Sequence, residues 1–160
     1  MIHISNISCV KFEPKQPHDR NYIFITEGKG CSSEVGMRNT GRQLLNLNPS
    51  ICVQGKIVHE LLHSLGFLHM HTANERDEYL EVKWDNIKKS AALNFHQFKS
   101  HVSMFGTNFD YDSILHYSEK AFAIDKSKPT LVPIYKDMAK NMGQRIGNFS
   151  FVRNKTLTYF

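Results

Sequence analysis

The chain has no uninterrupted apolar run of the roughly 18 residues that a transmembrane helix requires, so the sequence predicts no membrane span. Its first residues, Met1–Asn6, have neither the charged start nor the long apolar stretch of a signal peptide. We therefore expect either a chain that is not secreted as written, or one whose true beginning is absent.

Runs of basic residues are also missing, although the formal net charge is +5. Lysine and arginine are scattered, and no five of them are consecutive. This is the pattern of a dispersed basic surface rather than of a nucleic-acid interface. The sequence therefore predicts no nucleic-acid partner.

Cysteine is scarce, with three residues in the whole chain. In a reducing compartment all three would be thiols, whereas an extracellular protein would form one disulfide and leave one cysteine over. With 160 residues, of which 41% are hydrophobic, the chain suits one globular domain that buries roughly 70% of its unfolded-chain surface. We expect a single domain over residues 1–160.

The most informative stretch is a cluster of histidines around one glutamate, His59-Glu60-Leu61-Leu62-His63-Ser64-Leu65-Gly66-Phe67-Leu68-His69. His59 and His63 are four residues apart, so on a helix both imidazoles project from one face and can hold one ion at about 2.0–2.1 Å. Gly66 can adopt the left-handed conformation that ends a helix, which lets His69 return to the metal. Three neutral imidazoles leave one position of a tetrahedral zinc open for water, as in catalytic sites.

Glu60 lies roughly 100° around the helix from His59. That offset keeps its carboxylate off the zinc and within reach of a zinc-bound water, for which it acts as general base.

The alternative is an amphipathic core helix that carries histidines by coincidence. Gly66 and His69 argue against coincidence, because the pattern then extends beyond H-E-x-x-H. The helix also has a broad apolar face of Ile57, Val58, Leu61, Leu62 and Leu65.

The elements expected around this helix are mostly strands in the first half of the chain. Residues 9–12 alternate as a short half-buried strand, and the apolar run 22–26 predicts a central strand. Residues 44–47 predict a strand at the sheet edge, where an extended peptide could pair with it. The zinc helix is expected over about residues 53–66.

The second half has weaker periodicity and is expected to form a largely irregular lobe, with the zinc between it and the first half. Residues 71–85 are polar and predict irregular chain, and residues 88–98 predict a helix. Residues 106–108 predict a loop and about 112–117 a turn. Pro129 and Pro133 indicate extended chain. The expected fold class is α+β.

Several segments, together with the histidine pattern, resemble the astacin family of metzincin endopeptidases. Cys31–Gly36 is similar to the family's C-x-S-x-V-G segment, Asp112–Tyr117 to its S-x-M-H-Y turn, and Met142–Arg145 to its M-G-Q-R stretch. Further residues fall where the family places such residues: His71, Thr72, Arg76, Asp77, Tyr79, Val82, Trp84, Asn86 and Ile87. The resemblance extends from about Cys9 to Arg145.

This resemblance implies a metzincin catalytic domain that cleaves peptide or protein substrates outside the cell and binds one zinc ion per chain. His59, His63 and His69 would be the metal ligands, and Glu60 would activate the water. Tyr117 would be an additional ligand that can leave the metal and donate a hydrogen bond to the developing oxyanion. Arg145 would lie near the pocket for the residue after the scissile bond, or on the surface.

The resemblance also makes predictions for the cysteines and for the completeness of the fold. It predicts a disulfide between Cys31 and Cys52, and no disulfide within this chain for Cys9, whose family partner lies beyond Phe160. The family's first strand and long helix precede the position of Cys9. We therefore expect a chain incomplete at both ends that exposes apolar surface and is weakly stable.

Two residues depart from the family at the site. Leu115 replaces the methionine that packs beneath the zinc, a volume-conserving change that usually costs less than about 1.5 kcal/mol. Met70 replaces a glutamate that holds the mature N-terminus. These departures, together with the expected truncation, favour a rival hypothesis, a zinc-binding recognition module without catalysis. Such a module has no chemical need for Glu60, so we predict a zinc endopeptidase, whose oligomeric state the sequence leaves open.

Overall fold

The computed structural model describes residues 1–98 and 108–146, which fall into two compact units. Unit 1 comprises Met1–Phe67 and the segment that begins at Arg145, and unit 2 comprises Leu68–Gln144. The expected loop at 106–108 therefore lies largely outside the described residues. In the part of the chain that is described, no helix is long and apolar enough to cross a membrane.

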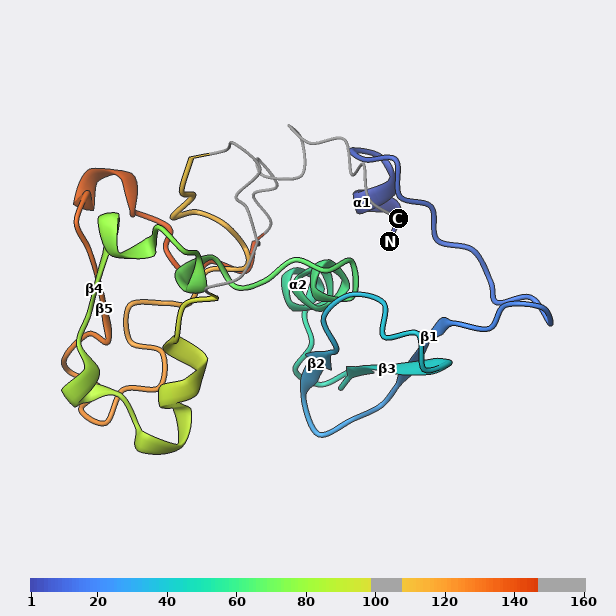
Figure 1. Ribbon diagram of the computed structural model, residues 1–160, viewed down its shortest axis with the longest axis horizontal. Coiled ribbons are helices and arrows are strands. Elements are labelled where there is room, and N and C mark those ends of the chain that lie inside the picture. The colour runs from blue at the N-terminus through green and yellow to red at the C-terminus, as the bar shows by residue number, and fades with distance from the viewer. Residues whose placement is uncertain (99–107, 147–160) are drawn as a thin grey trace. The chain divides into compact units, whose positions relative to one another are not determined.

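Unit 1 contains a three-stranded sheet in the order β1-β3-β2, from β1 (Tyr22–Thr26), β2 (Cys31–Ser33) and β3 (Arg42–Leu47) (Figure 1). β1 and β3 are parallel and pair from Tyr22 opposite Arg42 to Thr26 opposite Asn46. β2 is antiparallel to β3, with Cys31 opposite Leu47. A four-residue helix, α1 (Ile2–Ser5), lies at the start of the chain.

The predicted positions of two strands are wrong. β3, expected at the edge, lies between the other two strands, and β1, expected in the centre, is an outer strand of the described sheet. Within this sheet, β2 is the strand that the sequence did not reveal, because its three small or polar residues show no apolar alternation. Three consecutive residues of β1, Ile23, Phe24 and Ile25, are 37%, 44% and 47% exposed. Side chains on both faces of this apolar strand are therefore partly exposed in the described residues, as expected for a sheet that exposes apolar surface.

Residues 9–12 form no strand, which corrects a further expectation. The alternation is present, since Val10 and Phe12 are half-buried and Cys9 and Lys11 are exposed. Among the residues that the structure describes, no strand pairs with this segment, and side-chain alternation does not supply the backbone partners that define a strand.

The helix that carries the histidine pattern, α2 (Gln54–Ser64), packs against β2 and β3 (Figure 1). Val58, Leu61 and Leu62 are buried, as the apolar face predicted. Gly66 has φ +95°, and beyond it the N–H of Phe67 returns to the carbonyl of Leu62 (3.1 Å). The predicted stop at this glycine is confirmed, because a side chain at that φ would be strained.

Unit 2 consists mainly of short 3-10 helices and a two-stranded antiparallel sheet, so the prediction of a largely irregular second half is confirmed. The strands are β4 (Leu80–Val82) and β5 (Leu131–Pro133). The 3-10 helices are η1 (Met70–Thr72), η2 (Arg76–Glu78), η3 (Trp84–Asn86), η4 (Lys89–Phe95) and η5 (Lys136–Met138). η4 replaces the longer helix expected over 88–98, and β4 lies within the stretch expected to be irregular. Residues 112–117 form the expected turn.

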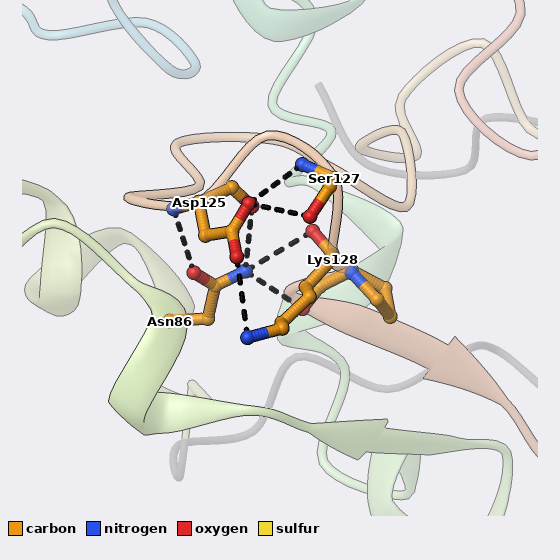
Figure 2. A network of polar contacts seen from close by, with 5 residues as sticks. Asn86, Asp125, Ser127 and Lys128 are labelled. Carbon is orange, nitrogen blue, oxygen red and sulfur yellow. Dashed lines mark hydrogen bonds and ion pairs between the residues drawn. The ribbon is translucent and has the colours of Figure 1, made fainter.

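Side-chain hydrogen bonds to carbonyls supply much of the order in unit 2. The amide nitrogen of Asn86 donates to the carbonyls of Asp125 (3.2 Å), Lys128 (3.0 Å) and Pro129 (3.1 Å), and its oxygen accepts from the Asp125 N–H (2.9 Å) (Figure 2). Within the same loop, the Asp125 carboxylate accepts from both the N–H and the hydroxyl of Ser127. These hydrogen bonds lower the pKa of Asp125 to about 2. One amide thus holds a loop that has no strand or helix of its own.

Candidate metal centre

Two of the predicted metal ligands lie one turn apart on α2. The Nε2 atoms of His59 and His63 are 3.0 Å apart, and both side chains are buried. Two nitrogens bound at about 2.0–2.1 Å to one tetrahedral ion would be about 3.3 Å apart. The observed spacing is therefore close to that of a shared metal.

The orientation of His63 also suits a metal ligand. Its Nδ1 lies 2.7 Å from the carbonyl oxygen of Phe67. A carbonyl oxygen only accepts hydrogen bonds, so Nδ1 carries the hydrogen and Nε2 presents its lone pair. Metal-ligating histidines usually make such a hydrogen bond through the ring nitrogen that does not bind the metal. Burial lowers the pKa of His63, so the ring is neutral at neutral pH, as metal binding requires.

The carboxylate of Glu60 lies on the same helix, and its pKa is shifted. Burial raises this pKa, while the positive charge of Arg145 and a hydrogen bond from the backbone N–H of Ser33 oppose the rise. Ser33 also ties β2 to α2 through its hydroxyl, which lies 2.7 Å from the hydroxyl of Ser64. Sequence reasoning missed Ser33, because this residue acts on Glu60 through a backbone N–H.

A cavity of about 260 Å³ opens beside Glu60 in unit 1. It is lined by Cys31, Ile51, Lys56, His59, Glu60 and Arg145. The carboxylate can therefore reach solvent or a bound molecule although it is largely buried. Arg145, for which a surface position was the alternative, lies at this cavity, and Lys56 is a lining residue that the sequence did not single out.

The other predicted site residues lie in unit 2. His69 directly precedes η1, and its ring centroid is 4.6 Å from that of Tyr117. Tyr117 is the last residue of the turn at 112–117, and its ring is stacked on that of His71 with centroids 3.9 Å apart. Both replaced positions are buried: Met70 donates its backbone N–H to the carbonyl of Leu115 (3.1 Å). Each replaced position therefore holds a buried apolar side chain.

The two cysteines expected to pair do so. Cys31 of β2 and Cys52, just before α2, form a disulfide with a Cα–Cα distance of 5.8 Å. Cys9 is exposed and takes no part in this bond.

Sequence comparison supplies the family. The family model for astacin, a peptidase family, matches residues 1–159. The chain belongs to the astacin family. Its His59, His63 and His69 are the H-E-x-x-H…H zinc-binding triad of that family, and among the described residues they are the group whose side chains could hold a metal ion. Astacin-family proteins are typically secreted or extracellular.

Individual astacins agree with this assignment. Zinc metalloproteinase nas-13 of Caenorhabditis elegans is 37% identical over 88% of the chain, and human meprin A subunit beta is 34% identical over 87%. The chain spans only 30% and 20% of their lengths. High choriolytic enzyme 1, a hatching enzyme zinc-protease from Oryzias latipes, has a similar structure, with a TM-score of 0.85, 32% identity and coverage of 94% of this chain and 73% of its own. The predicted metzincin fold is thereby confirmed.

Proposed function

We propose that this astacin-family chain is the catalytic part of a secreted zinc endopeptidase that hydrolyses peptide bonds in protein substrates. The observation that supports this best is a buried carboxylate, Glu60, on the same helix as two histidines whose Nε2 atoms converge. A recognition module would need the histidines but not a carboxylate of raised pKa beside a cavity.

Each residue then has a chemical task. A bound zinc would polarise the scissile carbonyl and make the attacking water more acidic. Glu60 accepts the proton of that water and delivers it to the leaving amine, for which a raised pKa is suitable. The phenol of Tyr117 donates a hydrogen bond to the oxygen that becomes negative.

The direct test is cleavage of a peptide library by the pure protein, before and after treatment with a chelator, alongside metal analysis. We expect one zinc per chain and a loss of cleavage that returns when zinc is restored. A protein that holds zinc but cleaves nothing would support the recognition module instead.

The role proposed for Tyr117 predicts a specific loss. Tyr117→Phe removes the hydroxyl and keeps the ring stacked on His71, so kcat should fall by roughly 10²-fold while zinc content and unfolding temperature stay the same. Steady-state kinetics and metal analysis provide the measurement. Tyr135→Phe, the same change on a half-exposed tyrosine of unit 2, serves as the control. Wild-type turnover in Tyr117→Phe would reduce Tyr117 to a packing residue.

The cavity predicts a substrate preference. Lys56 and Arg145 contribute two positive charges to its lining against the single carboxylate of Glu60, so a substrate side chain that enters it should be acidic. A hydrogen bond to a charged group contributes about 1.5 kcal/mol or more, so Lys56→Gln should lower kcat/KM for acidic peptides about tenfold and leave neutral peptides unchanged. Paired fluorogenic peptides that differ only in Glu or Gln measure this preference. An equal loss for both peptides would contradict it, and Lys89→Gln, at an exposed lysine of unit 2, is the matched control.

A further inference from the structure

Phe122 has an unusual backbone for a large side chain. Its φ is +55°, in the left-handed region that favours glycine and asparagine. Among the described residues the other non-glycine with positive φ is Asn39, a residue type that tolerates this conformation. An aromatic residue at such a position stores strain, which is often found at functional sites.

The chain on both sides of Phe122 fixes this conformation. Its carbonyl accepts the N–H of Lys88 (3.0 Å), and the next residue, Ala123, forms a β-bridge with Ile87. On the preceding side, the carbonyl of Ala121 accepts the hydroxyl of Thr130 (2.8 Å). These bonds involve only backbone atoms of residues 121–123, so they would equally hold an asparagine or a glycine.

Burial of the ring does not explain the phenylalanine either. The side chain is 44% exposed, so much of its apolar surface remains in water. Its neighbours are aromatic: the ring centroid lies 5.5 Å from that of Tyr117 and 6.2 Å from that of Phe95. The left-handed turn thus directs a partly exposed ring toward the phenol that we place at the oxyanion.

Tyr117 is in contact with three rings of unit 2 besides His69. His71 stacks on it at 3.9 Å with 25° between the planes, and Phe95 meets it edge-on at 5.7 Å. Both of these rings are fully buried. The Nε2 of His71 lies 2.9 Å from the carbonyl oxygen of Asn94, which fixes the orientation of the stacked ring. Phe122 is the one exposed member of the three.

We propose that Phe122 is a positioning residue for Tyr117: its ring limits the range over which the phenol can swing and keeps the hydroxyl where the oxyanion forms. The proposal rests on the proposed function, because only an endopeptidase needs Tyr117 at that place. A restriction of this kind matters in the transition state and not in substrate binding, so it should be seen in kcat.

The test is Phe122→Asn, which removes the ring and suits the left-handed backbone. We expect kcat to fall about tenfold, with KM, zinc content and the unfolding temperature of the full chain retained. Phe122→Tyr, which keeps an aromatic ring at this position, should retain most of the wild-type kcat. In the Tyr117→Phe background, Phe122→Asn should cause no further loss, because both changes act through the same hydroxyl.

Ile124→Asn is the matched control. Ile124 lies two residues further along, is 60% exposed, and donates its backbone N–H to the carbonyl of Asn86 (2.8 Å). The same apolar-to-amide change there should leave kcat as in the wild type.

A second measurement does not depend on catalysis. The ring resonances of Tyr117, assigned by their loss in Tyr117→Phe, should move in the NMR spectrum of Phe122→Asn and stay in place in Ile124→Asn. Unmoved resonances, or an equal rate loss with and without the Tyr117 hydroxyl, would overturn the proposal. Failure of the proposed function would appear elsewhere, as wild-type turnover in Tyr117→Phe or as no cleavage by the wild-type chain.

Discussion

Glu60→Gln is expected to keep its zinc and to lose peptide hydrolysis by about 10²- to 10⁴-fold, the range that general acid–base catalysis contributes. Glutamine has the shape of glutamate, and its side-chain oxygen can still accept the N–H of Ser33, so α2 and the two histidines should be undisturbed. The change removes only the group that takes the proton of the attacking water.

Metal analysis, unfolding temperature and kcat/KM on one peptide together provide the measurement. Glu27→Gln is a suitable control, since Glu27 is exposed at the end of β1 and lies outside the cavity lining. Loss of zinc from Glu60→Gln would mean that Glu60 belongs to the metal site, and unchanged hydrolysis would exclude it as the base.

The second large effect concerns the disulfide. Replacing both Cys31 and Cys52 with serine opens a loop of 21 residues and should lower the free energy of unfolding by about 3 kcal/mol. Small domains have about 5–15 kcal/mol in total, so this loss is substantial. Activity should fall as well, because β2, which carries Ser33, is no longer tied to the segment before α2.

Urea unfolding followed by far-UV circular dichroism measures the change, because α2, the longest helix of the described residues, follows Cys52 directly in unit 1. Cys9→Ser is the natural control, because Cys9 is exposed and outside the disulfide. An unchanged unfolding free energy in the double serine variant would show that β2 stays in place without its covalent link.

The helix and its histidines could be predicted because the residues that determine them are close together in the sequence. The spacing of His59 and His63, the apolar face and Gly66 all lie within one short stretch, and a period of 3.6 residues translates directly into one face of a helix. The Cys31–Cys52 bond came from the family pattern rather than from spacing, since three cysteines allow three different pairs.

Strand order could not be predicted, because it depends on partners distant in the sequence. An apolar run such as 22–26 indicates that a strand has apolar faces, but it does not say how many neighbours the strand has. β2 pairs with β3 through backbone atoms of Ser32 and its neighbours, which leave no side-chain signature. The same holds at the site, where Ser33 acts through its N–H and Phe67 through its carbonyl.

The Asn86 network of Figure 2 has a consequence for how the protein ages. Asparagine side chains slowly lose their amide nitrogen and become acidic, one reason why proteins of heat-loving organisms contain few of them. Here that single nitrogen donates to three carbonyl oxygens. After deamidation an oxygen would stand in its place, with no hydrogen to offer and a negative charge facing three acceptors. Deamidation of this one side chain during prolonged storage would then remove the three hydrogen bonds that hold the 125–129 loop, although the chain itself stays intact.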